Sequence, residues 1–165
     1  DVGRLLLTKI LQENLMTTQK ERETIQQKSI DIIKEAAGPN PWARAYLWML
    51  ARITRTLDDI YDDDQEVTRE DLLEVFDYLF IKLPTNQFYV AHQDVLVSQH
   101  LSMWNAWMAA NKAEHGDEVD QIYAHVWRDT HQEVIPIVAL LTQGHEQMNI
   151  VSDKVRQLFK KQLGE

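Results

Sequence analysis

A dense group of carboxylates is the feature of this sequence best suited to chemistry: five aspartates stand within seven residues, at positions 58, 59, 62, 63 and 64. Asp58 and Asp62 are four residues apart, so on a helix they share one face, with Asp59 beside them. Like charges at this spacing destabilise a helix by about 0.2–0.5 kcal/mol per pair, and the negative end of the helix dipole adds to that cost. A hard divalent cation would offset the repulsion and could in turn hold phosphate oxygens. The cluster therefore predicts a Mg²⁺ or Mn²⁺ site on Asp58, Asp59 and Asp62 that could hold a ligand through its phosphate oxygens.

The same cluster has a second interpretation, as an acidic face exposed to water. On a helical wheel the aspartates lie opposite the apolar stripe and alongside Arg44 and Arg55, which favours exposure. Leu47 and Trp48 flank that face, which favours a covered site. Both interpretations stay open at the level of sequence. The second describes a non-catalytic helical interaction protein.

A further pair of carboxylates, Asp129 and Glu133, is spaced four residues apart near the edge of another apolar stripe. A carboxylate beside a core face needs a partner or a raised pKa. If the pair faces the aspartate cluster, it completes a metal site of the kind that helical bundles build between facing helices. The alternative is an ion pair with an arginine of another helix, for which Arg52 and Arg55 are the candidates.

Two short stretches resemble the aspartate motifs of the squalene/phytoene synthase family. Residues 55–62 read R-T-L-D-D-I-Y-D, which is similar to the first motif of that family, R-x-x-D-D-I-x-D. Arg128 and Asp129, followed by Glu133, resemble the second motif, R-D-x-x-E-D, but the Glu comes one residue late and no Asp follows it. The resemblance is confined to these stretches, and members of the family are much longer chains.

The resemblance implies an all-helical enzyme that binds isoprenoid diphosphates through Mg²⁺. We expect the arginines that open the two stretches to contact the ligand and the carboxylates to hold the metal. The candidate residues are therefore Arg55 and Arg128 for the ligand, and Asp58, Asp59, Asp62, Asp129 and Glu133 for the metal.

Composition excludes several other classes of function. The formal net charge of −9 argues against nucleic acid or an anionic membrane surface as a partner. Cysteine is absent, which removes disulfides and thiolate chemistry, and no glycine-rich phosphate loop supports a nucleotide cofactor. The longest apolar run, residues 134–141, is too short to span a membrane. Without an export pattern in the first residues, we expect a cytoplasmic protein.

Helical periodicity runs through the whole chain, and no stretch alternates as a strand would. The pattern predicts an all-α, single-domain antiparallel bundle of six or seven helices and no sheet, in which residues 1–15 form a peripheral helix or an extension. Capping and breaking residues place the helices at 2–15, 18–37, 41–63, 68–84, 87–114 and 117–143, with a kink at Pro136 and a last helix that Ser152 and Asp153 cap.

The helices over 41–63, 87–114 and 117–143 carry the heaviest apolar stripes, and we expect them to form the core. The chain has five tryptophans and five methionines, several of them on amphipathic helices. This surplus predicts a symmetric homodimer.

Overall fold

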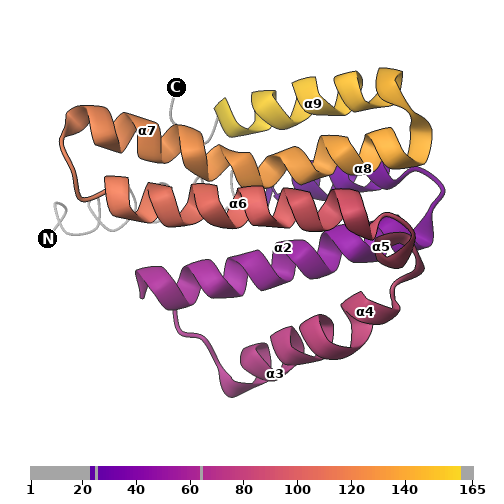
Figure 1. Cartoon of the computed structure of the whole chain (residues 1–165), viewed down its shortest axis with the longest axis horizontal. Helices are drawn as coiled ribbons and strands as arrows, with labels where there is room; N and C mark the ends of the chain where they lie inside the picture. Colours follow the sequence, from indigo (N-terminus) through magenta and orange to yellow (C-terminus); the bar gives the residue numbers. More distant parts are fainter. Residues whose placement is uncertain (1–22, 25, 64, 161–165) are drawn as a thin grey trace, which may run out of the picture.

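The computed structural model describes residues 23, 24, 26–63 and 65–160, and every regular element within these ranges is helical (Figure 1). The predicted all-α fold class is therefore confirmed. None of the described helices is long and apolar enough to cross a membrane. The predicted helix over 2–15 and the start of the one over 18–37 lie outside the described residues. The elements in chain order are a helix over residues 26–37, α2 (Pro41–Asp62), α3 (Arg69–Asp77), the π-helical η1 (Tyr78–Lys82), α4 (Leu83–Thr85), α5 (Gln87–Ala91), α6 (Gln93–Ala113), α7 (Glu118–Arg128), the 3₁₀-helical η2 (Asp129–Glu133), α8 (Val134–Gln143) and α9 (His145–Lys160).

Local capping signals set several helix ends where the sequence predicts them. The Asn40 side chain accepts hydrogen bonds from the backbone N–H groups of Trp42 and Ala43, at 3.0 and 3.1 Å, and so caps α2. Thr68 and Asp71 form a reciprocal capping box at the start of α3. Gly144, at φ 95°, separates α8 from α9. That backbone conformation is open to glycine and strained for other residues.

The predicted helix over 117–143 is divided by the 3₁₀ turn η2, one turn before Pro136. Proline has no N–H to donate to the carbonyl four residues earlier, and its ring clashes with that carbonyl. For Pro136 the residue concerned is Gln132, which lies within η2. The predicted kink is therefore present, displaced toward the N-terminus by the geometry of the lost hydrogen bond.

The predicted helix over 87–114 is broken at His92, where neither proline nor glycine stands. Tertiary contacts fix the short α5 separately from α6. Asn86 caps α5 through the N–H of Tyr89, and its amide donates to the carbonyl of Trp42 in α2 at 3.0 Å. Phe88 is buried, with its ring 5.8 Å from that of Tyr46. These contacts hold α5 against α2, while α6 leaves in a new direction from His92.

One predicted helix boundary holds to within a residue and another is wrong. The helix that Thr68 begins runs through η1 and α4 and ends at Thr85, one residue after Pro84. Ser152 does not cap the last helix, because α9 already begins at His145. Val151 and Val155 are buried one turn apart on α9, so packing extends the helix through Ser152.

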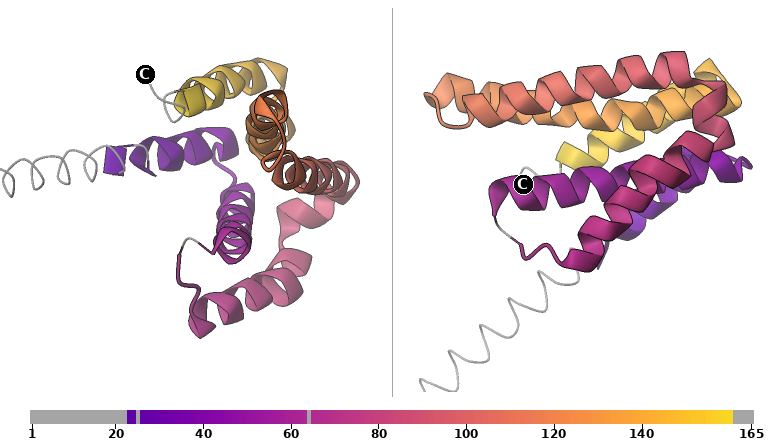
Figure 2. Two further views of the ribbon diagram at one scale, coloured as in Figure 1. Left: turned by 90° about the vertical axis from the view of Figure 1, so that its left-hand side faces the viewer. Right: turned by 60° about the horizontal axis from the view of Figure 1, so that its bottom comes forward.

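The main core joins more helices than the sequence predicts. It draws on α2, α5, α6 and α8, as expected, but also on the helix over 26–37 and on α9. Figure 2 shows the helix over 26–37 lying between α2 and α9. The fully buried side chains of the main core include Leu96, Val138 and Val151.

The continuous helical segment of α3 and η1 lies outside this core, against one flank of α2 (Figure 1). Arg52 of α2 holds it there, since its Nε donates to Glu74 at 2.7 Å and its guanidinium also pairs with Asp71. The hydrogen bond from Arg52 holds the pKa of Glu74 below its ordinary value. Val75 is the buried residue of α3.

Candidate ligand-binding cavity

A cavity of about 920 Å³, partly open to solvent, is lined by residues of the helix over 26–37, α2, η1, α4, α5, α6, α7, η2, α8 and α9. Its walls are mostly aliphatic and aromatic, and include Ile53, Leu101, Met103, Trp104, Val134 and Leu158. Small-molecule sites in proteins are cavities of about 300–1,000 Å³ with apolar walls and a few polar groups. This cavity has that size and character.

Both predicted motif stretches reach the cavity. Arg55 and Asp58 of α2 line it, as do Arg128 and Asp129 at the junction of α7 and η2. The two stretches are far apart in sequence, and each of them contacts α6.

Contacts with α6 show that the two stretches lie at the same end of the cavity. The indole Nε1 of Trp107 donates to Asp58 Oδ1 at 3.4 Å, and Arg128 Nη2 donates to Asn111 Oδ1 at 3.3 Å. Trp107 and Asn111 are one helical turn apart, about 6 Å along the axis of α6. We call this region, with Arg55, Asp58, Arg128 and Asp129, the polar end of the cavity.

The remaining predicted metal ligands are engaged elsewhere and do not line the cavity. Asp59 pairs with Arg55 at 3.0 Å, and Glu133 pairs with Arg156 at 2.9 Å. Asp62 is exposed near the end of α2. Within the described ranges no three histidine, aspartate or glutamate side chains come together as a metal-binding group. The five predicted ligands are therefore not assembled around one ion, because basic side chains supply the counter-charge for two of them.

The alternative partners predicted for Asp129 and Glu133 are also wrong in detail. Arg52 forms ion pairs with Glu74 and Asp71, and the arginine that pairs with Glu133 is Arg156 of α9. An ion pair does hold Glu133, but its partner comes from a helix that the sequence pattern does not bring near.

Two buried hydrogen-bond donors near the polar end have no acceptor among the described residues. The guanidinium of Arg128 donates through Nη2 to Asn111 and to Glu114. Its Nε, and the Nδ2 of Asn111, are buried and have no hydrogen-bond partner among the described residues. An unpaired buried donor costs about 1–3 kcal/mol, and neither of these two atoms has surface open to the cavity.

Asn111 contacts Arg128 near the polar end but is not among the predicted site residues. Asparagines on a long helix are usually solvated, but this side chain is only 2% exposed. The signal in the sequence is its position one turn after Trp107 and three residues before Glu114, on the face of α6 that meets both stretches.

An aromatic group forms the wall of the cavity toward the other end of α6. Tyr46 Oη lies 2.7 Å from His100 Nε2, and the rings of Tyr46, Tyr89 and His100 stack in pairs with centroids 5.9–6.0 Å apart. His100 and Tyr89 line the cavity, while Tyr46 is fully buried behind them. Burial raises the pKa of the Tyr46 phenol and lowers the pKa of the His100 imidazole, so both groups are neutral at pH 7. The sequence signal for His100 is its place on the stripe of Leu96, Met103 and Trp107.

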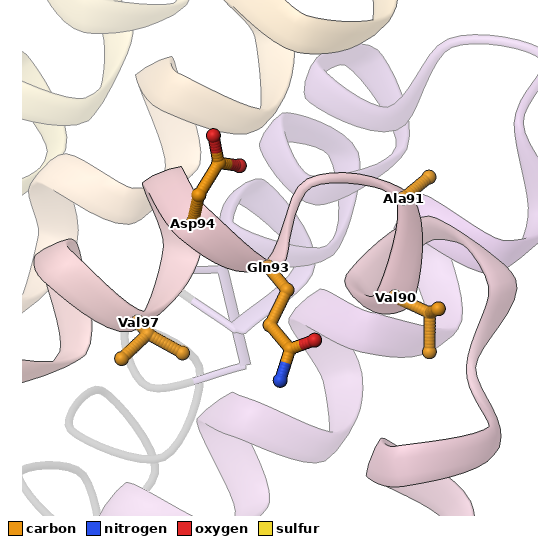
Figure 3. Close-up of a pocket in the computed structure, with 5 residues that line it drawn as sticks. All are labelled: Val90, Ala91, Gln93, Asp94 and Val97. Atoms are coloured by element: carbon orange, nitrogen blue, oxygen red, sulfur yellow. The ribbon is translucent and has the colours of Figure 1, made fainter.

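A second depression, of about 570 Å³, lies where α5 meets α6 (Figure 3). Its polar residues do not converge: the Asp94 side chain points away from those of Gln93 and Val90. It therefore offers no grouped polar contacts to a ligand, and the cavity inside the bundle is the candidate site.

No family model, curated protein or solved structure matches this chain. The resemblance to the squalene/phytoene synthase family accordingly stays a prediction that rests on residues 55–62 and 128–133.

Proposed function

We propose that this protein binds an amphipathic small molecule whose apolar tail fills the cavity and whose phosphate or diphosphate head lies at the polar end. The observation that carries the proposal is the lining of the cavity, which is apolar over most of its wall but includes the Arg55 and Arg128 side chains at one end. Arg55 is paired with Asp59 and Arg128 with Glu114, so a phosphate head would share the two guanidinium groups with these carboxylates. Guanidinium groups bind phosphate oxygens strongly because the hydrogen bonds are charge-assisted.

An isoprenoid diphosphate, the ligand that the family resemblance implies, has this division into tail and head. Asp58 and Asp129 are the two predicted metal ligands that line the cavity. Two carboxylates are too few to hold a cation by themselves, and the phosphate oxygens of a ligand would supply further oxygen atoms to coordinate it. Mg²⁺ or Mn²⁺ bound together with the ligand stays a prediction, and so does any catalytic step.

Intrinsic fluorescence provides the test, because Trp104 and Trp107 line the cavity and report on a ligand inside it. The probes are dodecyl phosphate, dodecanol and inorganic phosphate, titrated without metal and then with Mg²⁺. We expect saturable binding of dodecyl phosphate and much weaker binding of either part alone. Trp107→Phe should reduce the fluorescence change, whereas Trp42→Phe, outside the cavity, should not.

Equal affinity for dodecyl phosphate and dodecanol would contradict the head site. Absence of saturable binding by both would contradict the cavity as a ligand site.

We propose one alternative function, as an interaction protein, because an apolar face is exposed on α3 and η1. Leu73, Phe76, Phe80 and Ile81 are between 55% and 68% exposed, and the rings of Phe76 and Phe80 stack at 5.7 Å. A homodimer formed through this face would bury it. Sedimentation at micromolar concentration tests this: a dimer that Phe80→Glu converts to monomer supports it, and a monomer of 19.3 kDa in the unmodified protein contradicts it. The cytoplasmic location stays a prediction.

A further inference from the structure

His100 borders the cavity at a level of α6 well away from the polar end. It precedes Trp107 by seven residues and Asn111 by eleven, which places it about 10–16 Å along the helix axis from the contacts of Asp58 and Arg128. The walls near it are apolar, with Val97, Leu101 and Met103 on the same helix. A polar group in this part of the cavity is not explained by binding of an anionic head.

The hydrogen bond with Tyr46 determines which nitrogen of His100 carries the proton. The Tyr46 phenol is fully buried, and its hydrogen-bond partner among the described residues is His100 Nε2. A buried hydroxyl must place its proton on an acceptor, so the phenol donates and Nε2 accepts. Burial keeps the imidazole neutral. A neutral imidazole that accepts at Nε2 carries its hydrogen on Nδ1.

The Nδ1–H group of His100 is available to a ligand. Nδ1 has no hydrogen-bond partner in the part of the chain that the structure describes, and it is not sealed from open space. The open space that His100 borders is the cavity. Stacking on Tyr46 and Tyr89 holds the ring in place, so the donor is oriented before a ligand arrives.

We propose that His100, positioned by Tyr46, is a second polar contact for the ligand and selects tails that carry an oxygen acceptor about 10–16 Å from the anionic head. The acceptor is a hydroxyl, carbonyl or ether oxygen within an otherwise apolar tail. The inference rests on the proposed function, since it assumes that the tail occupies the cavity. It narrows the ligand from a plain hydrocarbon phosphate to an oxygenated one.

A pair of isosteric probes tests the inference. Dodecyl phosphate and ω-methoxydecyl phosphate have the same chain length, but in the second an oxygen replaces one methylene and can only accept. At about 1.2 Å per bond, this oxygen lies roughly 14 Å from the phosphorus, within the required range. Both dissociation constants are measured for the unmodified protein, for His100→Leu and for the control His115→Leu, which replaces an exposed histidine outside the cavity.

We expect His100→Leu to shift the ratio of the two dissociation constants toward dodecyl phosphate by about two- to tenfold, the loss of one hydrogen bond. His115→Leu should leave the ratio unchanged. If both probes bind but His100→Leu does not change the ratio, the inference is wrong and the proposed function stands. If neither probe binds the unmodified protein, both are wrong.

A spectroscopic measurement on the unmodified protein keeps the inference testable even if His100→Leu does not fold. The ¹⁵N chemical shifts of the His100 ring should show hydrogen on Nδ1, and Tyr46→Phe should change that pattern, because Nε2 loses its donor. A ring with hydrogen on Nε2 and a bare Nδ1 would overturn the proposed donor role.

Discussion

Replacing Arg128 with methionine should separate ligand binding from stability. The substitution keeps an unbranched side chain of similar length but removes the guanidinium, with its bonds to Asn111 and Glu114. It also removes the buried Nε that has no partner among the described residues. Loss of the bond to Asn111 leaves its amide oxygen unpaired, which costs about 1–3 kcal/mol, and loss of the partly exposed pair with Glu114 costs about 0–1 kcal/mol. Removal of the unpaired Nε returns about 1–3 kcal/mol. These terms nearly cancel, so the free energy of unfolding should change by less than about 2 kcal/mol.

Binding of dodecyl phosphate should respond much more strongly to Arg128→Met. A hydrogen bond to a charged group contributes about 1.5–3 kcal/mol, so the dissociation constant should rise about 10- to 150-fold. Tryptophan fluorescence gives the dissociation constant, and urea unfolding of the same samples gives the stability.

Arg156→Met is the matched control for Arg128→Met. Arg156 pairs with Glu133 at 2.9 Å, its side chain is 60% exposed, and it does not line the cavity. We expect this variant to change both quantities little, because exposed ion pairs contribute about 0–1 kcal/mol. If the two variants lose the same affinity, the effect is one of net charge and the head site is not at Arg128. If Arg128→Met unfolds the protein, the balance of terms above is wrong.

Three further predictions concern the core, the α2–α3 contact and the aspartate cluster. Leu96→Ala should lower the free energy of urea unfolding by about 2–5 kcal/mol, because Leu96 is fully buried and a cavity would remain; a loss below 1 kcal/mol would refute its place in the core. Arg52→Met should lower the melting temperature at pH 7, and the deficit should shrink as the pH falls below 4.5, the ordinary pKa of Glu74. Arg52 holds the folded-state pKa of Glu74 below that value, so its contribution is present above pH 4.5 and lost as Glu74 protonates; a deficit that is constant down to pH 3 would contradict this origin. If Asp58 and Asp62 bind Mg²⁺, the ion should raise the melting temperature, and the double variant to asparagine should abolish that rise while stabilising the metal-free protein slightly; a rise that NaCl of equal ionic strength reproduces would mean charge screening.

Helix ends in this protein were predictable wherever a single residue satisfies the backbone locally. Asn40, Thr68 and Gly144 act within one turn of their own positions, and each ends or begins a helix as predicted. The breaks that were missed have distant causes. His92 carries no breaking signal of its own, and the chain turns there because Asn86 and Phe88 are held by α2.

The candidate site likewise has residues that the sequence predicts correctly and residues whose place only the packing decides. The residue types and spacings identify Arg55, Asp58, Arg128 and Asp129, and all four line the cavity. The same patterns name Asp59, Asp62 and Glu133 with equal weight, but these side chains do not reach it. Spacing shows which residues share a helix face, but it does not show which of them will form an ion pair with a neighbouring arginine.

By itself, the sequence determined the helical class and the capped helix ends, because periodicity and capping act over one or two turns of a single helix. The tertiary structure decided which of the predicted carboxylates line one cavity. It also decided that Arg55 and Arg156 neutralise Asp59 and Glu133, and that Tyr46 orients His100 toward the cavity. These outcomes depend on how the helices pack, and packing is the sum of many apolar contacts among helices that are far apart in the chain.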